Sequence, residues 1–572
     1  MNAAAMLLVA VAAWFPAEDW TDHPDPVASE RARKGGTLRF NGGQSPKSYN
    51  AFVDNNSYTR MIFDLMYENL VSLDSATLDF VPGLARRWCV SEDGREFTFV
   101  IDEHARWSDG TPVTASDVKW TFDAVMAPTS DTGPWKTMLG VFESPEVLDG
   151  RTVKFRKKGD SPKDWRDLMH CGMFWILPER AFAGRPFNSA SFVGIPVSSA
   201  YFLHSIDEQI SCELRRNRSW WRRDMPSVRG MYNFDRMVFR YYADNENAFE
   251  AFKKRMIDVY PVYSARIMAT GTKGEAFAHN WILKRRIRNH DPIGFQGFAM
   301  NMRRAPFDKL KVRQAMAKLL DRATMNRTLM NGEYFLLKSY CTDLYGTGHP
   351  CGNMQWEYDP EGARLLLQEA GVGGGFKFTF LSRSSGEDKF LSLYSSALEK
   401  CGIKMEIVRK DFAGWMRDMD TFSFDMTWAA WGASVFRNPE TMWHSREGAR
   451  NGGNNITGLS IPEVDALIER EKKMQSAADR ENAYREIDSK IAAAVPYVLL
   501  WHTDEHRILY WNKFGTPETV LGRLGGEEGA LAYWWYDEDR AEELAEAVNG
   551  GGFLPNVPLR VDFDDMRSGD WR

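Results

Sequence analysis

The chain has 572 residues, of which 44% are hydrophobic and 26% are charged, and its formal net charge is −6. This length exceeds what a single hydrophobic core supports, so we expect two or three domains. The acidic balance argues against the clustered basic surface that nucleic-acid binding requires, and the composition is that of an ordinary soluble globular protein.

The chain starts with an apolar run over residues 3–15. This run is too short to span a bilayer but has the length of the hydrophobic segment of a signal peptide, which we assign to residues 1–17. No Lys or Arg precedes the run, and Phe15-Pro16-Ala17 is a poor cleavage site. The first cysteine, Cys89, lies far beyond it, so we expect an exported, soluble protein without a lipid anchor.

Residues 105–125 combine a turn with the start of a helix. Residues 109–112, Asp-Gly-Thr-Pro, are turn formers. Thr114 and Asp117 have the spacing of a capping box, in which each side chain satisfies a free backbone N–H of the first helical turn. An apolar stripe at helical spacing follows and predicts that this helix packs on a core; its members are Val118, Phe122 and Val125.

Strand and helix patterns alternate through the rest of the chain, which favours a mixed α/β architecture. We expect strands at residues 152–156, 234–242, 377–381 and 404–408, and helices at residues 246–256, 360–370 and 389–400.

Several stretches resemble the peptide-binding extracytoplasmic proteins that serve ABC importers, family 5 of the solute-binding proteins. Residues 82–122 fit PxLAxxW…SEDGxxFTFxI…WSDGTPVTAxDVxxTF. Residues 294–315 resemble gFxFNtrrpPFxDxrVRqAla, and residues 424–434 resemble fDmxxxxWgxs. The pattern after residue 495 is similar to the branch associated with oligopeptide and microcin C uptake. Together the resemblance covers roughly residues 34 to 540.

The resemblance implies a periplasmic binding protein-like α/β fold of the large three-domain type, with two lobes, a hinge and an interlobe cleft. It places the core of lobe I in residues 34–70, 191–285 and 495–540, with an accessory domain in residues 71–190. Lobe II corresponds to residues 286–494. Residues 541–572 form a C-terminal extension to which we assign no function.

The resemblance also implies where the ligand binds. The family uses the loop before residues 61–70 and the loop after residue 431 as parts of the cleft, and small residues beside aromatic ones suit an extended ligand. The substrate-binding residues that we expect are Asn56, Ser57, Tyr58, Trp135, Gln296, Phe298, Trp431, Gly432, Ala433 and Ser434.

One position departs from the family pattern. Oligopeptide binders of this family carry an Asp in the loop after the strand at residues 424–431, and that Asp pairs with the amino terminus of the ligand. Here Ser434 stands at the expected place, and no acid occurs before Glu440. We therefore hypothesise that a free amino terminus is not required, so that modified, blocked or longer peptides are accepted.

Two further patterns bear on chemistry. Residues 502–506 read H-x-x-E-H, a metalloprotease motif, but apolar runs on both sides predict a strand, a turn and a strand, so the two His would not share a helical face. We expect no metal, no cofactor and no catalysis. Cys341 and Cys351 flank a short run of turn formers, and we expect them to form a disulfide.

The sequence thus predicts the periplasmic substrate-binding component of an ABC importer, a monomer that closes about a hinge on an oligopeptide or peptide-like ligand and delivers it to the inner-membrane permease. Two alternatives remain open. The same fold could bind an oligosaccharide, for which the 21 Trp are a mild argument, or the chain could be a secreted hydrolase.

Overall fold

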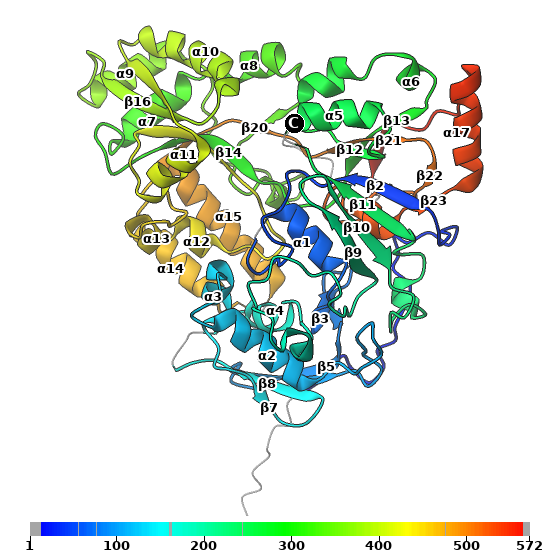
Figure 1. Cartoon of the computed structure of the whole chain (residues 1–572). Helices are drawn as coiled ribbons and strands as arrows, with labels where there is room; N and C mark the ends of the chain where they lie inside the picture. The colour runs from blue at the N-terminus through cyan, green and yellow to red at the C-terminus, as the bar shows by residue number, and fades with distance from the viewer. Residues whose placement is uncertain are drawn as a thin grey trace, which may run out of the picture. The chain divides into compact units, whose positions relative to one another are not determined.

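The computed structural model describes residues 13–54, 56–75, 77–159, 163–242, 244–474 and 476–563 (Figure 1). They form two compact units. Unit 1 holds the described residues of Met1–Tyr263, Lys273–Asn289 and His506–Phe563, and unit 2 holds those of Ser264–Thr272 and His290–Glu505. Each unit is therefore built from separated parts of the chain.

Unit 1 is organised around an eight-stranded mixed sheet of order β24-β13-β21-β12-β2-β11-β10-β9. Strand β2 near the start of the chain pairs in parallel with β11 and β12, and its Leu38 and Phe40 are fully buried. The strands are β2 (Thr37–Asn41), β9 (Tyr201–Asp207), β10 (Ser211–Arg216), β11 (Arg236–Arg240), β12 (Val259–Pro261), β13 (Ile282–Arg288), β21 (His506–Trp511) and β24 (Arg560–Asp562).

A second, antiparallel sheet of unit 1 has the order β1-β5-β6-β8-β7. It carries the predicted turn and helix, and the capping box is confirmed: Asp117 N donates to Thr114 Oγ1 at 3.3 Å, and Thr114 N donates to Asp117 Oδ2 at 2.9 Å. The apolar stripe of this helix is buried. The elements are β1 (Trp14–Phe15), β5 (Ala85–Val90), β6 (Glu96–Ile101), β7 (Glu146–Val147), β8 (Thr152–Arg156), α2 (Ala115–Met126), α3 (Gly133–Leu139) and α4 (Asp167–Gly172).

Unit 2 contains a five-stranded sheet of order β17-β16-β18-β14-β19 with an apolar core on each face. Because side chains alternate along a strand, Phe298 of β14 enters one core and Ala299 the other. The elements are β14 (Phe295–Met300), β16 (Lys377–Ser382), β17 (Lys404–Arg409), β18 (Met426–Trp431), β19 (Tyr497–Leu499), α7 (Leu310–Lys318), α8 (Arg322–Leu329), α9 (Pro360–Glu369), α10 (Asp388–Glu399), α11 (Phe412–Asp420), α14 (Pro462–Glu471) and α15 (Ala477–Ala494).

The remaining elements are short or lie outside the large sheets. They are α1 (Ser57–Asp64), α5 (Asn245–Lys253), α6 (Glu275–Ala278), α12 (Pro439–Trp443), α13 (Ser445–Ala449), α16 (Gly529–Tyr533), α17 (Glu538–Gly550), β3 (Val71–Leu73), β4 (Phe80–Pro82), β15 (Phe335–Leu336), β20 (Trp501–His502), β22 (Phe514–Gly515), β23 (Trp535–Tyr536), the single turns Glu179–Phe182, Pro226–Val228, Thr342–Leu344 and Ser385–Glu387, and the π-helical turn Ile267–Gly271.

The boundaries of the units differ from the predicted domains at four places. Residues 286–289, which the prediction gave to lobe II, belong to unit 1. Residues 495–505 belong to unit 2, because β19 pairs with β14 and places Val498 opposite Phe298. Ser264–Thr272 also belongs to unit 2, although the prediction gave it to lobe I. The predicted C-terminal extension contributes β24, which pairs in parallel with β13 at the edge of the large sheet of unit 1; its residues 564–572 lie outside the described residues.

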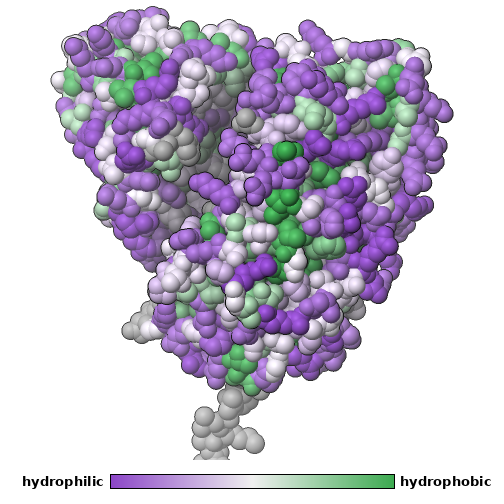
Figure 2. Space-filling model, in the orientation of Figure 1, coloured by the Kyte–Doolittle hydropathy of each residue, from purple (hydrophilic) through white to green (hydrophobic). Residues whose placement is uncertain are grey.

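Most of the predicted signal peptide, residues 1–12, also lies outside the described residues. Trp14 and Phe15, near its end, pair with Cys89 and Trp88 of β5. Among the described residues, no helix combines the length and the apolar character needed to cross a membrane. Figure 2 shows hydrophilic residues over most of the face drawn, with apolar residues in smaller patches.

The predicted disulfide between Cys341 and Cys351 is wrong for this structure, in which both cysteines are unbonded thiols. The turn does bring both sulfurs to the same small cluster, formed with Leu344, Tyr345 and Tyr484. Each thiol has its own surroundings there. Cys351 Sγ donates to Lys338 O at 3.8 Å, and burial raises the pKa of the Cys341 thiol to about 12.

The capping box gives a test of the fold. Besides its bond to Thr114, the Asp117 carboxylate accepts a hydrogen bond from Glu179 N at 2.9 Å and is buried. Asp117→Ala removes the cap and leaves a buried amide without its acceptor, so we expect the free energy of unfolding in urea to fall by about 2–3 kcal/mol. Asp123→Ala, at an exposed position of the same helix, should change it by less than about 0.5 kcal/mol. Equal losses in the two variants would contradict the role given to the cap.

Candidate ligand-binding surfaces

In unit 2, strand β18 ends in a loop of small, exposed residues. The register pairs Gln296 with Ala430 and Phe295 with Trp431, so β18 is held by β14 up to its last residue. Gly432, Ala433 and Ser434 come directly after it and are exposed. A Cβ placed at Gly432 would have nothing within 4 Å. The backbone of this loop is therefore open to an approaching chain.

Trp431 is fixed at the entrance to this loop. Its ring is half-buried, and its Nε1 donates to Tyr497 Oη at 3.1 Å. Gly294 lies against it so closely that a Cβ there would be 2.2 Å from Trp431 O. Only glycine fits at this position. Because it has no side chain, the end of β18 can lie directly against the backbone at residue 294.

Gln296 and Phe298 lie on the neighbouring strand, β14, but their side chains contact other residues of unit 2. Gln296 Nε2 donates to Trp501 O at 2.8 Å, and Gln296 Oε1 accepts from Trp428 Nε1 at 3.0 Å. Phe298 has no exposed surface and packs against Phe380. The prediction that Phe298 contacts the ligand is therefore wrong for this structure, because the alternation of side chains along β14 places its ring in the core. Gln296 orients Trp428 with the amide that we expected to meet a ligand.

In unit 1, Asn56, Ser57 and Tyr58 lie together at the start of helix α1. Asn56 is the N-cap residue, and its Oδ1 accepts from Tyr58 N at 2.9 Å. Ser57 is exposed and Tyr58 is half-buried. Gly43, at φ +65°, packs on the Tyr58 ring, because a Cβ there would lie 2.4 Å from a ring carbon. The cap and this contact fix where the phenol points.

Tyr58 belongs to a cluster with Tyr263, Glu527 and Glu528, which we call the acidic cluster. Tyr263 hydrogen-bonds to Tyr58 and donates to Glu527 Oε1 at 2.7 Å. Burial and the charge of Glu527 raise the pKa of Tyr58 to about 12. Burial, followed by the charge of Glu528, raises the pKa of Glu527. The cluster offers phenol groups and carboxylates to a cationic or hydrogen-bonding ligand group.

The sequence contained a signal for the acidic cluster that we did not use. Glu527 and Glu528 stand side by side in a turn between Gly525 and Gly529, and Gly525 adopts φ +77°. Gly526 N donates to Glu528 Oε1 at 2.9 Å, which closes the turn. Glu528 is exposed and Glu527 is partly buried in this closed turn, and adjacent acids in a loop that other contacts fix favour a binding role.

Trp135 lies in a packed aromatic group. Its ring centroid is 5.0 Å from that of Phe52 and 5.2 Å from that of Trp175. Phe52 is buried, and Trp135 is only partly buried against the core. Trp135 therefore packs against the interior of unit 1.

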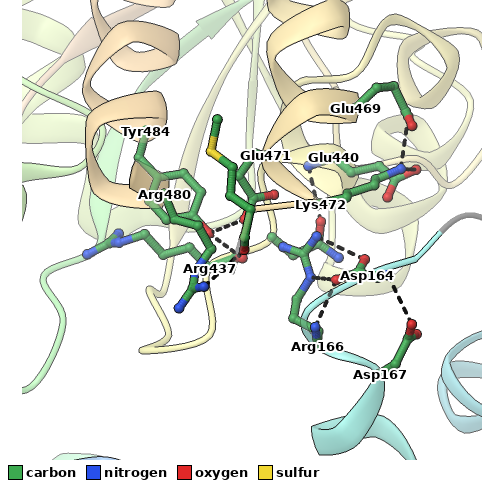
Figure 3. Close-up of polar contacts among 12 residues, drawn as sticks. Asp164, Arg166, Asp167, Arg437, Glu440, Glu469, Glu471, Lys472, Arg480 and Tyr484 are labelled. Atoms are coloured by element: carbon green, nitrogen blue, oxygen red, sulfur yellow. Dashed lines mark hydrogen bonds and ion pairs between the residues drawn. The ribbon is translucent and has the colours of Figure 1, made fainter. Parts of the chain in front are cut away.

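The first acid after the β18 loop is already paired. Lys472 lies between Glu440 and Glu469, with its Nζ 2.8 Å from Glu440 Oε1 and 2.8 Å from Glu469 Oε1 (Figure 3). The lysine side chain is only 7% exposed, so this pairing is protected from solvent. Ser434 Oγ accepts from Phe436 N at 3.2 Å. Neither group is positioned to replace a carboxylate facing a ligand ammonium.

His502 and His506 do not form a helical metal site. They belong to two strands, β20 and β21, as the flanking apolar runs predicted. Among the residues that the structure describes, no three His, Cys, Asp or Glu side chains are grouped so that they could hold a metal ion.

The comparisons with known proteins agree with this architecture. The family model of the bacterial extracellular solute-binding proteins, family 5 (Middle), matches residues 79–453. A putative binding protein of Brucella suis is 26% identical over 79% of this chain and 80% of its own length. The probable peptide-binding protein YejA of Agrobacterium fabrum is 25% identical over 94% of this chain and 97% of its own length.

Solved structures confirm the expected fold class. The periplasmic binding protein DppA of Helicobacter pylori, solved with the peptide STSA, superposes with a TM-score of 0.70 at 18% identity, over 88% of this chain and 99% of that one. The chain therefore has the mixed α/β fold of the periplasmic binding proteins.

The acidic cluster predicts a pH-dependent change in stability. Because the pKa of Glu527 is raised in the folded state, ionising this group lowers the stability of the fold. This loss is absent at pH values below the pKa of the unfolded state and complete at pH values above the pKa of the folded state. Glu527→Gln should therefore raise the melting temperature at pH 8 and change it little at pH 4. The exposed Glu518→Gln serves as control and should show no such dependence. A shift for Glu527→Gln that is equal at both pH values would contradict this assignment.

Proposed function

We propose that this chain, which belongs to family 5 of the bacterial extracellular solute-binding proteins, is the substrate-binding component of an ABC importer and that its solute is an oligopeptide or a peptide-like compound. Proteins of this class bind a solute and pass it to a permease. We further propose that this protein acts in the periplasm, as a monomer, and binds its solute without chemical change.

The observation that carries the proposal is the exposed loop Gly432, Ala433 and Ser434 beyond the last residue of β18. An extended peptide carries a backbone donor and acceptor on nearly every residue, and an open backbone segment can match them. The half-buried Trp431 beside the loop offers an apolar surface to a ligand side chain. A sugar would need fixed side-chain amides and carboxylates here, and the amide on the paired strand, Gln296, is occupied by Trp428 and Trp501.

The names of similar proteins support the proposal that the solute is a peptide. The Agrobacterium fabrum relative is named a probable peptide-binding protein, and the Helicobacter pylori structure holds the peptide STSA. In unit 1 the acidic cluster adds hydrogen-bonding groups beside Ser57, which suits the amide groups of a peptide or a basic side chain.

We also propose that recognition does not depend on a free amino terminus. Ser434 stands where other oligopeptide binders have an Asp, its hydroxyl accepts a bond from the loop, and Glu440 is paired with Lys472. An ammonium facing a hydroxyl instead of a carboxylate loses a charge-assisted hydrogen bond of roughly 1.5–3 kcal/mol. A ligand with a blocked amino terminus gives up no such bond.

Calorimetry on one peptide with a free and an N-acetylated amino terminus tests both statements. We expect both forms to bind, to differ by less than about 2 kcal/mol, and to be recovered uncleaved. Trp431→Ala should weaken both forms alike, whereas Trp20→Ala, at an exposed position of unit 1, should leave both affinities unchanged.

Two results would contradict the account. If neither form binds, nor any other peptide tried, the proposed peptide ligand is wrong. If peptides bind but acetylation costs more than about 2 kcal/mol, a carboxylate does hold the amino terminus, and repeating the pair in Glu527→Gln and Glu528→Gln would show whether it belongs to the acidic cluster.

A further inference from the structure

Unit 1 contains a hollow whose lining shares no residue with the acidic cluster. Its volume is about 460 Å³, and it lies against strand β2 and the segments next to β12 and β21. Helix α17, which Figure 1 shows beside β22 and β23, forms one wall through Ala541, Leu544 and Ala545. Its size is within the range of small-molecule sites.

The lining of this hollow is strongly cationic. Arg39, Arg240, Arg255 and Lys513 line it together with one carboxylate, Asp258. Four positive side chains therefore meet one negative side chain, in a protein whose formal net charge is −6. A local excess of positive charge in an acidic protein is not explained by composition.

Asp258 forms ion pairs with two of its neighbours, Lys513 and Arg39. Its side chain is 1% exposed, Lys513 Nζ lies 2.7 Å from its Oδ1, and Arg39 N donates to its Oδ2 at 2.8 Å. The Arg39 guanidinium is 3.8 Å from the same Oδ2. Asp258 thus pairs with Arg39 and Lys513, and among the described residues it forms no ion pair with Arg240 or Arg255.

Arg240 and Arg255 have no carboxylate partner within ion-pair distance among the described residues. Arg240 Nε is buried and finds no hydrogen-bond acceptor in the described part of the chain. The Arg255 guanidinium lies over the Trp511 ring, 4.7 Å from its centroid. Stacking on an aromatic face holds a guanidinium in place while its N–H groups stay available in the plane.

The backbone at Arg255 is of a kind that glycine normally occupies. Helix α5 ends in a Schellman turn, in which Arg255 N donates to Phe252 O at 3.0 Å and Met256 N donates to Ala251 O at 2.9 Å. Arg255 is the left-handed residue of this turn, with φ +61°. Glycine is favoured there because it lacks Cβ. An arginine at this position makes the fold less stable than a glycine would. Its side chain lines the hollow.

We propose that this hollow is a binding site for a small anion carrying at least two negative charges, as phosphate or carboxylate groups. Arg240 and Arg255 bind the anion, since guanidinium groups match both oxyanions with paired hydrogen bonds. Arg39 and Lys513 set the positive potential while remaining tied to Asp258. The lining of the hollow shares no residue with the proposed peptide-binding surfaces, so the anion would be a second solute of this chain.

Calorimetry at low ionic strength with pyrophosphate and with citrate tests the proposal on the full-length protein. We expect at least one of the two to bind with a stoichiometry of one. Arg240→Gln should weaken binding about ten- to a hundredfold, the effect of losing a charge-assisted hydrogen bond. Arg229→Gln, an exposed arginine outside the hollow, removes the same charge and should leave the affinity unchanged.

Arg255→Gly separates folding from binding. Because glycine suits the left-handed turn, this variant should melt at a higher temperature than the unaltered protein and yet bind the anion at least about tenfold more weakly. Vesicles of phosphatidylglycerol form a further arm: binding to them that is lost in Arg255→Gly, without binding of the free anions, would identify a lipid headgroup as the source of the phosphate.

Two outcomes would overturn the proposal. One is the absence of binding by pyrophosphate, citrate and vesicles at millimolar concentration. The other is binding that Arg229→Gln weakens as much as Arg240→Gln does, because it would show a general response to charge rather than a site.

Discussion

The pairing of strand β21 along both of its edges determines how unit 1 is built. β21 runs antiparallel to β12 on one side and to β13 on the other, with Leu509 opposite both Tyr260 and Lys284. This pairing returns the last part of the chain to a sheet begun by β2. A slip of one residue would turn every side chain of β21 to the other face, so the register also fixes where the segment after the strand begins.

The acidic cluster and the cationic hollow of unit 1 both depend on that register. The segment after β12 carries Tyr263 and the segment after β21 carries Glu527, and their hydrogen bond spans 264 positions of the sequence. Asp258 precedes β12 and Lys513 follows β21, and their ion pair anchors the cationic hollow. In unit 2, the pairing of β18 with β14 plays the corresponding part, because it holds Trp431 and leaves the next three residues open.

The family motifs in the sequence predicted the fold class, and local signals predicted the capped helix and the loop of small residues after Trp431. The capping box of Thr114 and Asp117 depends on neighbours three residues apart, and the loop after Trp431 could be predicted from its small residues. Contacts between distant segments could not be predicted in this way. The apolar run that contains Val498 fits either unit by composition, and only its pairing with β14 assigns it. The orientation of the Phe298 side chain likewise depends on the pairing of β14 with β18 and β19. The acidic cluster also depends on a contact between distant segments.

The central claim is that this protein binds a peptide-like solute, and mass spectrometry of the material released when the purified protein is unfolded tests it most directly. The account predicts a compound that contains amide-linked amino acids, released in near-stoichiometric amount and absent after exhaustive dialysis of the unfolded protein. Release of an oligosaccharide without amino acids, in the same amount, would contradict it.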